Sequence, residues 1–197
     1  PPLEVQATFN IENKSSHLFD IASIVTNRLK QSQLMQSPET TMSRYFGGLY
    51  FSFLQAAILD IILTNIDFCS ASQRDTLKAA ALGTASQIVN TVGKQFAQPI
   101  QPRNKAGSVK QRFANIVKRD RSMNALALYQ GWLLKYATLP KAIGKPECLQ
   151  QDFRTVITEN PSGFSVVYAD PPYTRDHYSR FYHVLETMCL RDNPPIS

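Results

Sequence analysis

The sequence has few of the features that mark secreted, metal-binding or membrane proteins. Its 197 residues include only three cysteines, Cys69, Cys148 and Cys189, which lie far apart and never form a CxxC pair. This spacing excludes a disulfide framework and a cysteine zinc site, and it predicts reduced, mostly buried thiols in a cytoplasmic protein. The most apolar stretch, residues 49–66, carries Asp60 in its middle. A buried helix therefore explains it better than a membrane span.

Glycine and acidic residues are also scarce. The eight glycines contain no GxG sequence, and the one adjacent pair, Gly47 and Gly48, precedes an apolar segment. We expect this pair to form a tight entry to a helix. Acidic residues number 15 against 21 lysines and arginines, a net charge of +6, which permits a polyanionic partner without requiring one. Hydrophobic residues make up 43% of the chain, which is enough for a core and excludes a disordered chain.

Helical periodicity dominates the first 140 residues. Apolar residues recur at helical spacing in four segments, at about residues 17–34, 50–66, 72–92 and 109–139. Ser72, with Asp75 three residues later, resembles a capping box that would begin the third segment, and Gly93 is expected to end it. After Pro146 the pattern changes: residues 164–169 form a short apolar run that predicts a buried central strand. The expected fold class is therefore α/β.

Positive charge is concentrated in one part of the chain. Residues 74–121 contain ten basic and two acidic residues, a net of +8, which leaves −2 for the rest. A basic helical module could contact the phosphate backbone of a nucleic acid, with Arg112, Lys118 and Arg119 as candidate contacts. The alternative is an ordinary solvated helix face.

The most informative motif is Asp170-Pro171-Pro172-Tyr173, which directly follows the predicted strand. Sites of α/β proteins lie where strands end, and this set suits methyl transfer to an exocyclic amino group. The Asp170 carboxylate and the Pro171 carbonyl would accept from the amine N–H groups and localise its lone pair, while both prolines fix the backbone. Tyr173 offers a ring on which an extruded base can stack. The alternative is a Pro-Pro turn that ends a strand, with Tyr173 in the core.

The sequence VVYADPPYT resembles the catalytic motif of S-adenosylmethionine-dependent amino methyltransferases, in particular bacterial adenine-specific DNA methylases. Two upstream blocks, YFGGLYFSFLQAAILDII and VNTVGKQFAQPIQP, and the block DPPYTRDHYSRFYHVLET stand in the same order as in that family, over about residues 45–187. The resemblance implies a Rossmann-like core with S-adenosylmethionine as methyl donor. It also implies that the acceptor is N6 of a flipped adenine in double-stranded DNA, in a cytoplasmic bacterial or phage enzyme of the restriction-modification type. Residues 1–69 and 141–197 would form the core, and residues 70–140 a helical, DNA-contacting insertion.

One feature departs from this family, whose members bind the cofactor with a glycine-rich FxGxG turn. Because the chain has no GxG, we expect that turn upstream of Pro1 or on a second subunit, so that the core is incomplete in this chain. Family members also carry an acidic residue about twenty positions before DPPY, near the cofactor's adenine. Asp152 fits that place, with Phe153 packing on the adenine ring. The alternative for Asp152 is a solvated loop carboxylate.

The residues after DPPY add candidate contacts to DNA. Arg175, His177 and Arg180 would lie near the mouth of the site and contact phosphates or the base. No metal site is expected, because methyl transfer from a sulfonium needs none. Two other functions stay open: an RNA guanine-N2 methyltransferase, and a catalytically silent DNA-binding or assembly subunit of a modification system.

Overall fold

The computed structural model describes residues 38–101, 103–108, 110–140, 144, 147–159, 165–170 and 179–192. The chain divides into two units. One comprises Pro1–Thr138 together with Tyr178–Ser197, and the other comprises Leu139–His177. Among the described ranges, none of the helices has the length and apolar content that crossing a membrane would require.

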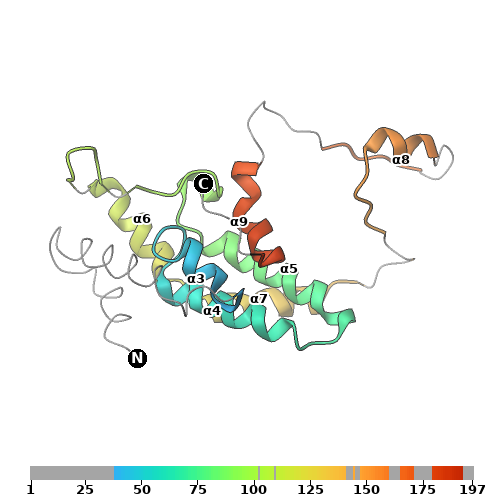
Figure 1. Ribbon diagram of the computed structural model, residues 1–197, viewed down its shortest axis with the longest axis horizontal. Coiled ribbons are helices and arrows are strands. Elements are labelled where there is room, and N and C mark those ends of the chain that lie inside the picture. The colour runs from blue at the N-terminus through green and yellow to red at the C-terminus, as the bar shows by residue number, and fades with distance from the viewer. Residues whose placement is uncertain are drawn as a thin grey trace. The chain divides into compact units, whose positions relative to one another are not determined.

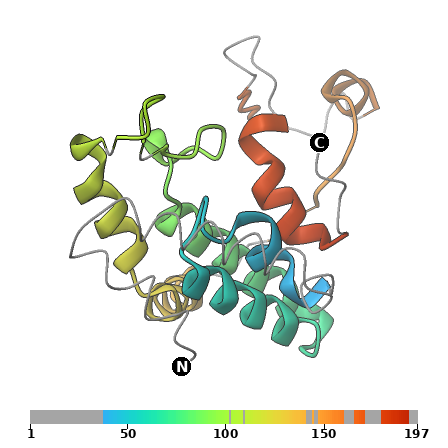
Figure 2. The same ribbon diagram turned by 60° about the vertical axis from the view of Figure 1, so that its left-hand side comes forward.

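The first unit is built from helices (Figure 1). Its elements are η2 (Pro38–Thr40), α3 (Thr41–Phe46), α4 (Phe53–Ile66), α5 (Ala71–Ile88), η3 (Val92–Lys94), α6 (Gln111–Ser122), α7 (Ala125–Ala137) and α9 (Ser179–Leu190). Helices α4, α5 and α7 contact one another, while α3 packs on α4 and α9 packs on both α3 and α5. In Figures 1 and 2, α6 stands away from this group of helices.

The core of this unit lies between α4, α5 and α7. Helix α4 contributes large side chains such as Leu59 and Leu63, whereas α5 presents the small residues Ala80, Ala81 and Ala85; all five are buried. Small residues on one helix let the axes approach closely, and the large residues of its neighbour then fill the space. Each fully buried leucine contributes about 1.5–3 kcal/mol relative to an exposed one.

Polar side chains inside α4 fix its neighbours. Asp60 is 5% exposed, and its Oδ1 and Oδ2 accept from the backbone N–H groups of Met42 at 2.7 Å and Ser43 at 2.8 Å. Because these N–H groups belong to the first turn of α3, which has no intrahelical acceptor for them, Asp60 caps α3 from another helix. Helix α4 itself begins with a capping box between Ser52 and Gln55.

The glycine pair, expected to be a tight entry to the apolar helix, lies in the turn between α3 and α4: Gly47 is the C-cap of α3, and α4 begins at Phe53 after its own cap, Ser52. Gly48 has a φ of +79°, a region that suits glycine. At Gly47 a Cβ atom would lie 2.6 Å from the Ser43 carbonyl oxygen and 2.9 Å from the Phe53 ring. Gly48 therefore suits glycine because of its backbone conformation, and Gly47 because a side chain would meet the Ser43 carbonyl and the Phe53 ring.

The predicted α/β fold class, with a Rossmann-like core, is wrong for the described part of the chain. That part is helical and contains no strand; its isolated bridges include Gly47 with Phe51 and Thr91 with Pro99. Residues 166–170 have no regular secondary structure and are exposed, with Val166 at 84% and Tyr168 at 87%. A strand is stable only when a neighbour completes its backbone hydrogen bonds, and the described residues supply no second strand.

Several local predictions also need correction. Helix α5 begins at Ala71 after Ser70, whose hydroxyl bonds to the Gln73 side chain, so Ser72 does not cap it. The helix ends at Ile88 rather than at Gly93. Of the three cysteines, which are all free thiols, Cys148 and Cys189 are exposed and Cys69 is intermediate rather than buried.

Candidate functional site

The C-terminal end of α6 is held by buried polar contacts. The Gln55 side chain on α4 donates from Nε2 to the backbone oxygens of Asp120 at 2.8 Å and Met123 at 3.0 Å. Arg121 donates from Nη2 to the Gly48 oxygen at 2.7 Å, and burial lowers the pKa of its guanidinium. Three separate parts of the sequence thus converge on the last turn of α6.

Asp120 is the centre of this anchor. Its side chain is fully buried, and Oδ1 lies 2.9 Å from Lys94 Nζ and 2.9 Å from Arg119 Nη2. Lys94, at a φ of +60°, also donates to the backbone oxygens of Gln87 and Val89. The ion pairs from Lys94 and Arg119, both to Oδ1, compensate part of the cost of burying a carboxylate; Oδ2 is buried without a hydrogen-bond partner among the described residues. The anchored end leaves the N-terminal half of α6 as a projecting arm.

Helix α6 carries the predicted phosphate contacts. Arg112, Lys118 and Arg119 are all exposed, whereas Val117 and Asp120 are buried. Arg112 and Arg119 are seven residues apart and so share one face, with about 10 Å between them along the axis. The structure therefore brings the three predicted residues together on one helix.

Other basic residues of this segment serve the fold. Arg74, Lys94, Arg103 and Arg121 each donate to backbone oxygens, those of Asp67 and Cys69 in the case of Arg74. The charge excess of residues 74–121 is thus only partly available for a partner. A sequence count cannot separate these two groups of cations, because their acceptors are backbone atoms.

A cavity of about 370 Å³ lies beside the first turn of α6. It is lined by Val92, Ala97, Gln98, Pro99, Ile100, Gln101, Lys110, Arg112 and Phe113. The Arg112 guanidinium carbon and the Lys110 ammonium lie 4.6 Å and 5.8 Å from the centre of the Phe113 ring. A cation is attracted to the face of an aromatic ring, so the lining of this cavity combines positive charge with a flat apolar surface.

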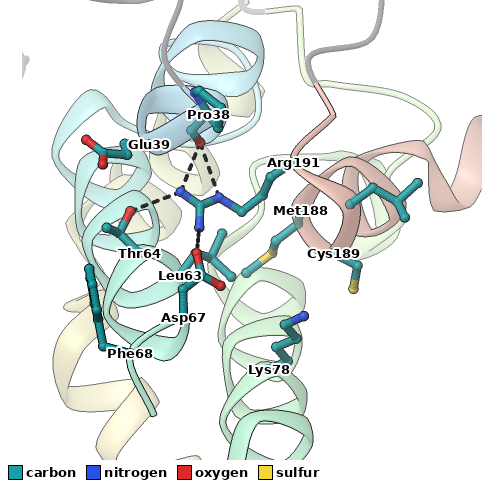
Figure 3. A pocket seen from close by; sticks show the side chains of 11 residues that line it. Pro38, Glu39, Leu63, Thr64, Asp67, Phe68, Lys78, Met188, Cys189 and Arg191 are labelled. Carbon is teal, nitrogen blue, oxygen red and sulfur yellow. Dashed lines mark hydrogen bonds and ion pairs between the residues drawn. The ribbon is translucent and has the colours of Figure 1, made fainter. Parts of the chain in front are cut away.

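A second cavity, of about 490 Å³, lies where the end of α9 meets α4 (Figure 3). Arg191 crosses it and donates to the Pro38 oxygen at 3.1 and 3.2 Å, to Thr64 Oγ1 at 3.0 Å and to the Asp67 carboxylate. Because these acceptors occupy all three guanidinium nitrogens, Arg191 acts as a clasp between α9 and α4. On the rim, Cys189 is an exposed residue, but partial burial of its thiol raises the pKa of that group, which disfavours a nucleophilic thiolate.

Asp170 is the part of the DPPY motif that the structure describes. It lies at the end of residues 166–170, a part of the second unit without regular secondary structure, and is exposed. Pro171, Pro172, Tyr173, Arg175 and His177 lie outside the described residues. Their predicted roles in stacking the base or contacting DNA stay predictions.

The predicted cofactor contacts lie at the start of α8 (Phe153–Glu159). Asp152 Oδ1 accepts from the Arg154 backbone N–H at 2.9 Å and lies 3.4 Å from Arg154 Nε. Phe153 is 66% exposed, with the Arg154 guanidinium 5.6 Å from its ring centre. Both side chains are open to solvent, and Asp152 is engaged in holding the first turn of a helix. These two residues do not by themselves enclose the adenine of S-adenosylmethionine.

Arg180 lies in the first turn of α9, in the first unit, and is exposed. Its backbone oxygen lies 3.0 Å from the His183 ring nitrogen Nδ1. His183 packs edge-on against Phe46 and Tyr50, with ring centres 6.0 and 5.6 Å apart. Arg180 therefore starts a helix whose next turn is fixed in an aromatic cluster.

No family model, curated protein or solved structure matches the chain. Within the described ranges, no group of three or more histidine, cysteine, aspartate or glutamate side chains could hold a metal ion. The sequence prediction missed Gln55, Lys94 and Asp120 as the anchor of α6, and Arg191 as the clasp. Gln55 had one visible signal, since it is a polar residue within an apolar helix.

Proposed function

We propose that the chain is part of a cytoplasmic DNA adenine-N6 methyltransferase, in which α6 contacts the duplex. The DPPY sequence at residues 170–173, with the flanking blocks of the same family in the same order, carries this proposal. The exposed carboxylate of Asp170 supports it, because a group that must meet an extruded base has to be accessible. The exposed cations of α6 support the choice of a nucleic acid as partner.

Asp170 would act on the acceptor amine. The lone pair of an aromatic amine is delocalised into the ring, so the nitrogen is a poor nucleophile. A carboxylate that accepts a hydrogen bond from the amine N–H localises that lone pair and stabilises the positive charge that develops during attack. The Pro171 carbonyl would accept from the second N–H, since a proline pair contributes no competing backbone donor.

S-adenosylmethionine, when bound, supplies the methyl group in this class of reaction. Asp152 and Phe153 do not enclose it, and the sequence has no GxG turn. The proposal therefore assigns the glycine-rich turn to a second subunit or to another segment of the protein. The role of Asp170 toward the amine is independent of that assignment.

Helix α6 would position the duplex through its backbone. Arg112 and Arg119 lie on one exposed face, and Lys118 is beside them. Contacts from these side chains to phosphates carry no sequence information and weaken with salt. We expect α6 to set affinity rather than the choice of target sequence.

A second candidate, a DNA-binding subunit without methyl transfer of its own, is favoured by one observation. The segment before Asp170 exposes Val166, Val167 and Tyr168 to solvent. Burying such a run would require a neighbouring structure, and the described residues do not provide it. In that case the chain would bind DNA through α6 and contribute Asp170 only within an assembly.

The proposal is tested by measuring methyl transfer from labelled S-adenosylmethionine to duplex DNA. The assay is run with the chain alone and again with extract of its source cells, which would supply a second subunit. Asp170→Ala is expected to lose at least about a hundredfold in rate, the scale for one positioned transition-state acceptor. Asp75→Ala, which removes an exposed carboxylate from α5, is the matched control. Equal rates for Asp170→Ala and wild type would remove Asp170 from the mechanism. Methyl transfer to guanine in RNA, and not to DNA, would show that the substrate is RNA.

Duplex binding at several salt concentrations tests α6 separately. The double variant Arg112→Glu, Lys118→Glu is expected to bind all duplexes more weakly and to lower the slope of log K against log salt by about 1.8, at about 0.9 per phosphate contact. Arg119 is left unchanged because it contacts Asp120. The control, Lys78→Glu with Lys135→Glu on α5 and α7, makes the same change in net charge. Equal losses in both doubles would show a general charge effect rather than a binding face.

A further inference from the structure

We propose that the cavity beside the first turn of α6 binds one nucleotide of the DNA strand. Its phosphate would lie against Lys110 and Arg112, its base against Phe113, and the base edge against Gln98 or Gln101. This inference rests on the proposed function, because it names where α6 would take up part of a DNA partner.

One wall of the cavity is rigid. Residues 97–101 belong to a loop held by an antiparallel bridge between Thr91 and Pro99. The Val92 N–H donates to the Gln98 oxygen at 3.1 Å, and the Ile100 N–H donates to the Asn90 oxygen at 3.2 Å. Asn90 and Ile100 are buried in turn. The backbone of this wall is thus fixed by hydrogen bonds, which limits where its side chains can reach, as base recognition requires.

The other wall carries the groups that bind nucleotides. Arg112 and Lys110 lie over the Phe113 ring, and Arg112 is exposed while Phe113 is only partly so. Aromatic rings and guanidinium planes are the usual stacking surfaces for bases, and the same cations bind phosphates. Gln98 and Gln101 are exposed at the opposite wall, and a glutamine amide can bond both N6 and N7 of adenine.

The charge of the lining distinguishes this cavity from the one crossed by Arg191. None of the described residues that line it is acidic, whereas Glu39 and Asp67 line the second cavity. An anionic ligand is therefore favoured beside α6 and disfavoured beside Arg191. The volume of about 370 Å³ lies in the range of pockets that hold small ligands, about 300–1,000 Å³.

The test measures binding of a fluorescent DNA oligonucleotide by Phe113→Ala and Phe113→Leu. Both remove the aromatic face, and leucine keeps most of the packing volume, so it serves if the alanine variant fails to fold. We expect affinity to fall about 5- to 150-fold, the loss of one stacked base, with an unchanged salt slope because no charge is lost. Phe113→Tyr keeps the ring and should bind as wild type. Phe68→Ala, which removes another exposed aromatic ring, is the control.

A second arm separates phosphate binding from base recognition. Lys110→Gln is expected to lower the salt slope by about 0.9, while Gln98→Ala or Gln101→Ala should reduce the preference for adenine over other bases in otherwise identical oligonucleotides. Wild-type affinity in both Phe113→Ala and Phe113→Leu would overturn the inference while leaving the α6 surface intact. No DNA binding by the wild-type protein would overturn both. Tighter binding of RNA of the same sequence would overturn the choice of DNA.

Discussion

Replacing Asp60 is expected to destabilise the helical unit by breaking the cap that α4 provides for α3. The carboxylate accepts from two buried or half-buried N–H groups, those of Met42 and Ser43. In Asp60→Ala both donors lose their acceptor, at about 1–3 kcal/mol for each unsatisfied group. The expected loss is therefore about 2–6 kcal/mol. Asp60→Asn keeps one acceptor oxygen, so about half that loss is expected.

The ionisation of Asp60 gives this prediction a pH dependence. Burial is the main cause of its raised pKa, which the hydrogen bonds from Ser43 and Met42 and the charge of Arg191 partly offset. Because the folded pKa lies above the unfolded one, the folded state binds the proton more tightly. The stability that comes from this tighter proton binding is fully present below the unfolded pKa, about 3.9. It is lost as pH rises through the folded pKa. Asp60→Asn should lack this part of the pH dependence.

Urea unfolding followed by circular dichroism, at several pH values from 4 to 7, measures both effects. The control is Asp75→Ala, which removes an exposed carboxylate from α5 and should change the free energy of unfolding by less than about 0.5 kcal/mol. An Asp60→Ala variant within that same margin would refute the capping argument. A pH profile of Asp60→Asn parallel to wild type would refute the assignment of the pH dependence to Asp60.

Two further substitutions test the packing of the helices. Gly83→Ala should lower the free energy of unfolding by about 1–3 kcal/mol, because its Cβ would lie 2.7 Å from the Trp132 ring. Gly131→Ala on α7, where a Cβ meets nothing within 4 Å, should instead raise it by up to about 1 kcal/mol. Thermal melting of both variants measures the difference. Arg191→Ala should speed amide hydrogen exchange in α9, because the end of that helix loses its bonds to Pro38 and Thr64. Arg191→Lys, which keeps the charge without the planar donor set, should exchange nearly as fast, and wild-type exchange in either variant would contradict the clasp.

The helices were predictable because their evidence is local. Apolar residues at helical spacing predicted α4, α5 and the pair α6 and α7, and Asp60 within an apolar stretch correctly argued for a buried helix. The predicted strand at residues 164–169 failed for a physical reason. An apolar run shows that a segment suits a sheet, but only another strand can complete its hydrogen bonds, and that information is not in the run itself.

The anchor of α6 was beyond sequence reasoning for a related reason. Gln55 and Asp120 are 65 positions apart, and the bond between them ends on a backbone oxygen, an atom that every residue has. A polar residue in an apolar helix indicates that some buried partner exists, but it does not say which. Asp120 looked like one more charge in a basic segment, although its side chain is fully buried.

Some of the basic residues bond within the fold and others are exposed on α6, and this difference restricts the surface on which a DNA partner would bind. Arg74 and Arg121 donate to backbone oxygens, and Lys94 is held by Asp120, so none of these three can move to a phosphate without breaking a contact of the fold. Arg112 and Lys118 remain exposed on the arm whose base these contacts fix. Cations held on a fixed helix lose less conformational freedom on binding than cations on a loose segment would. Lys94 and Arg121, which fix the end of α6, thus favour DNA binding by Arg112 and Lys118.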